Sequence, residues 1–143
     1  MKYILLMAGT KAGVEAYREW PQSDVQAHFA FLSRLNKELT EAGELVANDG
    51  LGSPDEARVV RAGKDGMPVT DGVFPEAKEF LLGYWIVDVD NPERAFEIAA
   101  KLSAGPAPDA GRTSMPIEVR RQVATSIAAI QPDHIRCTWT GER

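Results

Sequence analysis

The order of hydrophobic patterns restricts the possible folds of this chain more than any other feature. Residues 3–7 are a continuous apolar run that ends at Ala8-Gly9-Thr10, which predicts a strand at the centre of a sheet and covered on both faces. Residues 83–89 predict a second strand, with Trp85, Val87 and Val89 on one side. An amphipathic helical segment follows each strand, so the chain alternates strands with helices.

The first helix is expected over residues 24–42 and the second over residues 92–103. Ser23 followed by Gln26 is typical of a capping box, and Gly43 suits a helix end. Asn91-Pro92 is a cap followed by proline at the first helical position. The expected core positions of the two helices are Val25, Phe29, Leu32, Leu35 and Leu39, then Ala95, Ile98, Ala99 and Leu102.

The remaining segments are shorter and richer in turn residues. Glycine, proline and aspartate gather between residues 63 and 72, which indicates a loop or hairpin. Residues 117–123 alternate apolar and polar side chains, as in a half-exposed strand. The other expected elements are strands at 45–51 and 57–61, a short helix at 75–81 and a loop at 105–111.

This order is the split βαβ pattern of ferredoxin-like folds, so we predict an α+β domain with an antiparallel sheet over residues 1–123. Two helices would cover one sheet face only. A second copy packing on the other face is the expected solution, which predicts a homodimer. Residues 124–143 are expected to be a C-terminal extension that packs on the domain or on the partner.

Composition excludes several classes of function. The chain has 143 residues, a net charge of −5 and scattered basic residues, which disfavours nucleic acid as a partner. No apolar stretch approaches the roughly 20 residues that span a bilayer, so no membrane partner is expected. Cys137 is the only cysteine, which suits a reducing cytoplasm. No cofactor is expected, because the chain has no phosphate-binding or dinucleotide-binding glycine motif.

Residues 71–79 read Asp-Gly-Val-Phe-Pro-Glu-Ala-Lys-Glu and residues 83–87 read Gly-Tyr-Trp-Ile-Val. This pair of segments resembles the signature of the YCII-related family, in its DGPF subgroup, and the opening strand and the helix that carries His28 are similar to that family at matching places. Val73 stands where the subgroup has proline. The resemblance implies a dimeric α–β barrel with a pocket that holds a histidine and an acidic residue.

His28 and Asp71 are the candidate catalytic residues. Histidine side chains titrate near neutral pH, and a histidine at the edge of a core stripe can serve as a general acid or base. The alternative is a core-edge histidine that only satisfies its hydrogen bonds. Asp71 either orients His28 or belongs to a plain Asp-Gly turn.

Five further residues are candidate ligand contacts, and each has a structural alternative. Lys78 suits a carboxylate or phosphate on a ligand but equally a solvated surface. Tyr84 suits a hydroxyl contact or simple aromatic packing. The set is Gly72, Phe74, Glu76, Lys78 and Tyr84. His134 and Cys137 lack the spacing of a known metal site, so no metal is expected.

Three functions follow as hypotheses, of which the last is a purely structural dimer with a sheet face filled by apolar side chains and no polar cavity. The first is an enzyme that transfers a proton in isomerase-like or lyase-like chemistry on a small organic molecule, with His28 as acid or base and Asp71 as its partner. The second is a non-catalytic binding or regulatory module, which the resemblance links to alternative sigma factors. Convergence of the two side chains would favour the enzyme.

Overall fold

The computed structural model describes residues 1–72 and 79–123, and its main body is a four-stranded antiparallel sheet. The strand order is β2-β5-β1-β8, which is the ferredoxin-like order predicted from the sequence. β1 lies inside the sheet, between β5 and β8, as expected. The bounds are β1 (Lys2–Thr10), β2 (Leu45–Gly50), β5 (Glu79–Asp88) and β8 (Ile117–Arg121).

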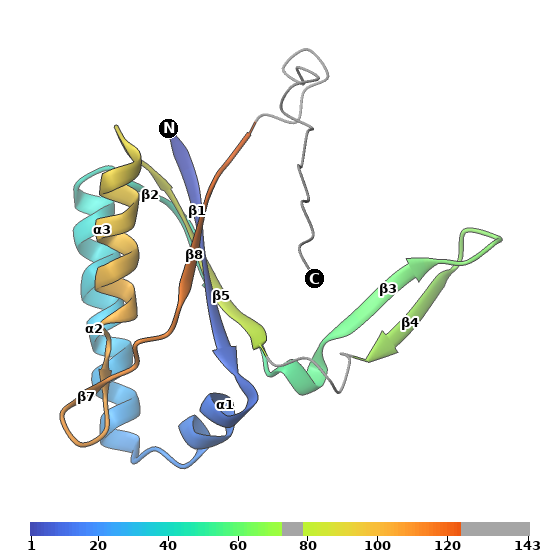
Figure 1. Ribbon diagram of the computed structural model, residues 1–143, viewed down its shortest axis with the longest axis horizontal. Helices are drawn as coiled ribbons and strands as arrows, with labels where there is room; N and C mark the ends of the chain where they lie inside the picture. The colour runs from blue at the N-terminus through green and yellow to red at the C-terminus, as the bar shows by residue number, and fades with distance from the viewer. Residues whose placement is uncertain (73–78, 124–143) are drawn as a thin grey trace, which may run out of the picture.

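Two long helices cover one face of this sheet (Figure 1). They are α2 (Gln22–Glu41) and α3 (Pro92–Ser103). A third helix, α1 (Lys11–Arg18), was not predicted and begins where β1 ends, with the Thr10 side chain accepting a hydrogen bond from the Gly13 amide. Of the described segments, only these three form α-helices.

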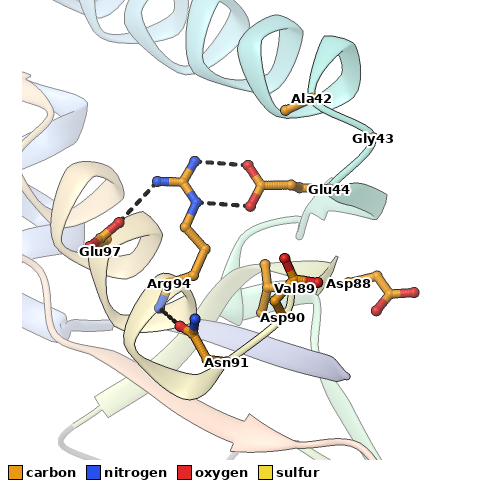
Figure 2. Close-up of a pocket in the computed structure, with 9 residues that line it drawn as sticks. All are labelled: Ala42, Gly43, Glu44, Asp88, Val89, Asp90, Asn91, Arg94 and Glu97. Carbon is orange, nitrogen blue, oxygen red and sulfur yellow. Dashed lines mark hydrogen bonds and ion pairs between the residues drawn. The ribbon is translucent and has the colours of Figure 1, made fainter.

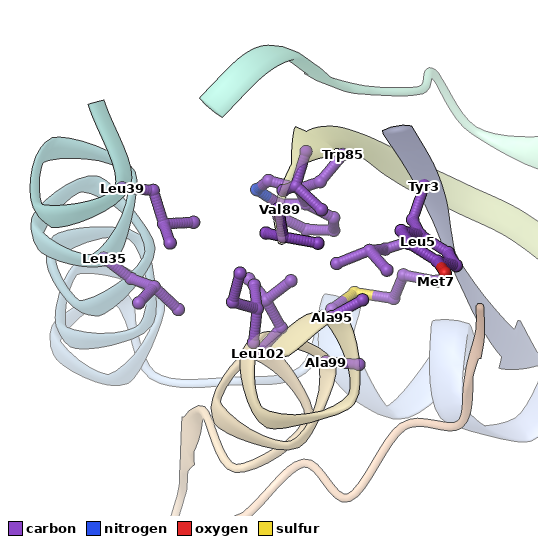
Figure 3. Packing of buried hydrophobic residues seen from close by; sticks show 12 residues of the cluster. Tyr3, Leu5, Met7, Leu35, Leu39, Trp85, Val89, Ala95, Ala99 and Leu102 are labelled. Atoms are coloured by element: carbon purple, nitrogen blue, oxygen red, sulfur yellow. The ribbon is translucent and has the colours of Figure 1, made fainter. Parts of the chain in front are cut away.

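The apolar core lies between the helices and the sheet. Leu5, Val87, Ile98 and Leu102 are fully buried. Leu35 and Leu39 of α2 point toward α3 and β5 (Figure 3). The indole N–H of Trp85 donates to Asn36 Oδ1 at 2.9 Å, so the polar atom of this large ring is satisfied.

Helix boundaries follow local chemistry closely at α3 and less closely at α2. Asn91 Oδ1 accepts from the Arg94 amide at 2.9 Å, which confirms the cap and the predicted span of 92–103. α2 begins two residues earlier than predicted, and no side chain caps it, so the Ser23 capping box is wrong. Gly43, at φ +72°, ends α2 in the left-handed conformation that glycine tolerates.

The buried face of α2 differs from the predicted stripe at one position. Phe29 is 57% exposed, whereas His28 is only 6% exposed and lies in line with Leu35 and Leu39. Both stripes fit helical spacing, so the sequence pattern alone does not distinguish them. The expected core role of Phe29 is therefore wrong.

A hairpin projects from the body between β2 and β5 (Figure 1). It follows the short helix η1 (Pro54–Glu56) and consists of β3 (Arg58–Ala62) and β4 (Pro68–Gly72). We call residues 58–72 the arm. Asp71 and Gly72 lie in β4, so the plain Asp-Gly turn is wrong for them; the turn of the arm contains Gly66 at φ +79°.

Two expected elements fall partly or wholly outside the described residues. Residues 79–81 belong to β5, so this part of the expected helix at 75–81 is a strand, and the rest of that helix lies outside. The C-terminal extension at 124–143 also lies outside and stays a prediction.

The second face of the sheet, away from the helices, carries apolar side chains that are only half-buried. Ile4 pairs with Ile86 and Leu6 pairs with Tyr84 across β1 and β5. We call this the open face. The expectation that the first strand is covered on both faces holds for one face within the described part of the chain.

Candidate functional site

His28 is the one buried polar side chain among the described residues, at 6% exposure. It lies in the second turn of α2, whose N-terminal part is near the lower end of the helical layer in Figure 1. Its Nδ1 lies 3.2 Å from the carbonyl oxygen of Pro106. Buried polar groups are costly unless they are bonded, so this contact explains how the ring is accommodated.

A short hairpin presents that carbonyl to the ring. It consists of β6 (Pro106–Ala107) and β7 (Gly111–Arg112). The turn is tight, because the Gly111 amide donates to the Pro108 carbonyl at 3.1 Å and both central residues, Asp109 and Ala110, have positive φ.

Hydrogen bonds to the end of α3 hold this hairpin in place. The Thr113 amide donates to the Gly105 carbonyl at 2.9 Å, and the Thr113 hydroxyl donates to the Ser103 carbonyl at 3.0 Å. The Ser103 hydroxyl donates in turn to the Met115 carbonyl at 2.7 Å. The Pro106 carbonyl is therefore fixed relative to α3 by backbone and hydroxyl contacts.

The contact with Pro106 determines which nitrogen of His28 carries the proton. A carbonyl oxygen only accepts, so Nδ1 must donate, and the neutral ring then has its lone pair on Nε2. Nε2 has no hydrogen-bond partner within the described ranges, and no side-chain nitrogen or oxygen there is both unbonded and fully buried.

Aromatic rings surround His28 on two sides. The Trp20 ring meets it edge to face, with centroids 5.9 Å apart, and the Phe29 ring lies at 6.1 Å. Tyr17 packs on Trp20 at 5.0 Å, and burial raises the pKa of the Tyr17 hydroxyl. The free nitrogen of His28 thus lies in an apolar and partly exposed setting.

Gly105 allows the hairpin to approach the imidazole closely. A Cβ atom at this position would lie 3.0 Å from Cε1 and 3.2 Å from Nδ1 of His28. These distances are shorter than ordinary contacts, so any larger residue would push the ring or the hairpin away. We call His28, Trp20, Gly105 and Pro106 the histidine end of the helical layer.

A hollow of about 530 Å³ lies at the other end of the layer, lined by residues of the α2–β2 and β5–α3 connections. Figure 2 shows Arg94 at its centre, with Glu44 and Glu97 facing the guanidinium group. Two hydrogen bonds of 2.8 Å join Arg94 to Glu44, and one of 3.0 Å joins it to Glu97. We call these three residues the ion-pair end.

The charges of the ion-pair end are satisfied within the chain. The hydrogen bonds from Arg94 hold the pKa of Glu44 below its usual range, while the acceptors Glu44 and Glu97 raise the pKa of Arg94. His28 and Ala42 are 14 positions apart on α2, about 21 Å of helix. The hollow is therefore not part of the histidine end, and its geometry fits a structural ion-pair cluster.

Asp71 does not meet His28 within one chain. It lies on the arm, and its carboxylate is 3.5 Å from Arg61 on the neighbouring strand. Gly72, at the end of β4, has no atom within 4 Å of a Cβ built on it, so no close approach requires glycine there. A pairing of Asp71 with His28 stays a prediction that a second copy would have to satisfy.

Tyr84 lies on the open face, and its hydroxyl donates to Asp49 at 3.1 Å. This hydrogen bond raises the pKa of the Tyr84 hydroxyl. The other expected ligand contacts, Phe74, Glu76 and Lys78, lie outside the described residues, as do His134 and Cys137.

Sequence reasoning missed Trp20, Gly105 and Pro106. Pro106 is 78 positions from His28, and a backbone carbonyl leaves no trace in the residue type, so only the folded chain reveals this contact. Trp20 offered one local signal, since it comes just before the helix that carries His28, eight positions further along the chain.

Within residues 1–72 and 79–123, no group of three or more His, Cys, Asp or Glu side chains is placed to hold a metal ion. None of the helices in these ranges is long and apolar enough to cross a membrane.

The sheet order and the helix positions define a ferredoxin-like α+β domain with a histidine held at one end of its helical layer. The chain belongs to the YCII-related family, whose domain model matches residues 1–117. It is also similar to an uncharacterised protein from Rhizobium meliloti (strain 1021), with 30% identity over 84 residues, which are 59% of this chain and 68% of that protein.

Proposed function

We propose that this chain is an enzyme that moves a proton on a small organic molecule, with His28 as the acid and base. The observation that carries the proposal is the hydrogen bond from Nδ1 to the Pro106 carbonyl, which leaves the lone pair of Nε2 without a hydrogen-bond partner among the described residues. A base needs a fixed ring and a free nitrogen, and His28 has both.

The proposed reaction has two proton transfers. Nε2 takes a proton from a carbon next to a carbonyl group; the C–H electron pair passes into an enolate and the ring becomes an imidazolium. The Nε2–H then returns the proton to the enolate: protonation of the same carbon gives exchange or epimerisation, and in a substrate with a neighbouring C=C bond, protonation at the far end of the conjugated dienolate moves the double bond and completes an isomerisation. The Pro106 carbonyl accepts from Nδ1–H throughout and stabilises the positive ring. The Pro106 carbonyl thus orients the His28 ring, which is the role that the sequence suggested for Asp71.

We also propose that the chain is a homodimer whose copies pack on their open faces. Ile4, Leu6 and Ile86 are half-buried there, and no helix of the described segments covers them. Two such faces packed together would remove this apolar surface from water. We further propose that the chain belongs to the DGPF subgroup, because residues 71–74 resemble the signature of that subgroup.

A non-catalytic binding module is the second candidate. The exposure of Phe29, at 57%, beside the His28 ring favours it, because an exposed aromatic side chain is a ready contact for a ligand. The enzyme transfers a proton to or from its substrate, whereas a binding module holds its ligand without proton transfer.

A deuterium-exchange assay tests the enzyme hypothesis without knowledge of the product. Small keto acids and lactones are incubated with the protein in D₂O, and loss of C–H signal is followed by proton NMR. We expect exchange of at least one compound by the wild type and a loss of about 100-fold or more in His28→Gln. His134→Gln, which changes the other histidine, is the matched control and should exchange normally.

Nitrogen NMR of His28 supplies the second readout. We expect the neutral ring to carry its proton on Nδ1, and Asp71→Asn to leave this unchanged, because Pro106 sets the tautomer. Ligand-induced shifts at Nε2 without any exchange would favour the binding module. Equal exchange by wild type and His28→Gln would reject His28 as the base.

A further inference from the structure

The arm exposes apolar side chains on both of its faces. Val60 is 58% exposed on one face and Val69 is 51% exposed on the other, while Met67 at the turn is 63% exposed. Every residue of β3 and β4 is exposed except Val59, which is half-buried. A two-stranded hairpin is only marginally stable in water when nothing covers it. The arm therefore presents a surface that a partner would stabilise.

Side-chain hydrogen bonds join the base of the arm to α1 and η1. Arg18 of α1 donates to Asp55 of η1 at 2.7 Å and to Ser53 at 3.2 Å. Arg58, the first residue of the arm, donates to the Ala57 and Asp55 carbonyls at 2.8 and 3.2 Å.

The direction of the arm identifies which surface it adjoins. In Figure 1 the helices α2 and α3 lie on one side of the sheet and the arm leaves on the other side. The open face, with half-buried Ile4, Leu6 and Ile86, is on that second side. A molecule that covers the open face would lie beside the arm and could contact both.

Charge favours a second copy of this chain as that molecule. The arm has three basic and two acidic residues, a net charge of +1, in a chain of net charge −5, so the rest of the chain carries −6. A twofold dimer places each weakly basic arm against an acidic body, and the same pair of surfaces is used twice.

We propose that the arm packs against a second copy of this chain and stabilises the dimer formed through the open faces. The proposal rests on the dimer proposed above, but it assigns the arm a separate contribution. Asp71 lies on the arm, so the proposal places it beside the partner.

Sedimentation tests the proposal with Val60→Asp and Val69→Asp, one on each face of the arm. We expect at least one of them to raise the dimer dissociation constant about tenfold or more, since a buried valine replaced by a carboxylate costs over 1.4 kcal/mol. Phe96→Asp, on the outside of α3 and similarly exposed at 55%, is the matched control and should leave it unchanged.

The outcomes separate this inference from the earlier proposals. A wild-type dimer with unchanged association in both variants would overturn the role of the arm alone. A wild type that stays monomeric at all concentrations would overturn both the proposed dimer and the proposed role of the arm. The exchange assay at His28 would still test the enzyme hypothesis separately. Hydrogen exchange supplies a check without variants: arm amides should be protected only as the dimer forms, and protection in the monomer would show that the chain covers its own arm.

Discussion

The two ends of the helical layer use opposite chemistry. At the ion-pair end, Arg94 makes three hydrogen bonds to two carboxylates, so every strong charge is already matched. At the histidine end, a buried ring makes one hydrogen bond to the main chain, and its second nitrogen has no hydrogen-bond partner among the described residues. The hollow of about 530 Å³ lies at the ion-pair end. The function proposed above therefore rests on unused bonding capacity and not on the volume of a cavity.

The largest expected effect of a single substitution is at Gly105. Gly105→Ala places a methyl group 3.0 Å from Cε1 of His28, so either the ring or the hairpin must move. We expect the free energy of unfolding to fall by about 2 kcal/mol and the single tautomer of His28 to become a mixture. Urea unfolding and nitrogen NMR measure the two effects.

Two variants control this experiment. Gly72→Ala meets no atom within 4 Å and should be neutral. In a His28→Ala background the same Gly105→Ala change should cost much less, because the ring is absent. An equal cost in both backgrounds would show that the glycine is needed for the hairpin itself and not for the histidine.

The sequence predicted the body of the fold well because its signals are local. Asn91-Pro92 and the spacing of Ala95, Ile98 and Leu102 determine α3 within its own segment. The sequence did not predict α1, which is only eight residues long and has no buried side chain. The Thr10 side chain caps this helix, so a local signal was present and was not recognised.

The site was predictable in part only, because its geometry depends on distant contacts. The sequence identified His28 as a candidate but placed it at the edge of the core stripe and Phe29 within the stripe. The structure has the reverse, since His28 is buried and Phe29 is exposed. His28 contacts the Pro106 carbonyl, which lies 78 positions further along the chain and which no local pattern indicates. Asp71 followed from resemblance to a motif, and within one chain it pairs with Arg61.

We expect the ion-pair end to make the free energy of unfolding depend on pH. Arg94 lowers the pKa of Glu44 in the folded chain, so folding favours the ionised carboxylate. That contribution is complete above the unfolded glutamate pKa of about 4.3 and is lost as pH falls further through the folded value. We expect a loss of about 1 kcal/mol, because Arg94 keeps a third of its side chain exposed.

Unfolding measured between about pH 6 and pH 3 checks this expectation, because this range extends above and below the unfolded glutamate pKa of about 4.3. Glu44→Gln should remove most of the extra loss, because a glutamine has no charge to protect. Glu97→Gln is the control at the same guanidinium, and it should change the curve less, since its carboxylate is 63% exposed. A wild-type curve that matches Glu44→Gln would mean that the pair does not hold its charge in the folded chain.

The smallest expected effect is a gain in stability at the histidine end. Asp109 and Ala110 have φ of 60° and 55°, in the left-handed region that costs about 1 kcal/mol or more for residues with a Cβ. Ala110→Gly should relieve this strain, and after the greater entropy of unfolded glycine we expect a net gain of about 0.5 kcal/mol. Thermal unfolding measures it.

Ala107→Gly, in the strand β6 of the same hairpin, is the matched control and should lower stability, because its backbone is not in the left-handed region. The tautomer of His28 should be unchanged in Ala110→Gly, since Ser103 and Thr113 still hold the hairpin to α3. A loss of the single tautomer would instead show that the strained turn itself aims the Pro106 carbonyl. Either result identifies which backbone segment orients His28, and this backbone contact is what distinguishes the histidine end from the ion-pair end.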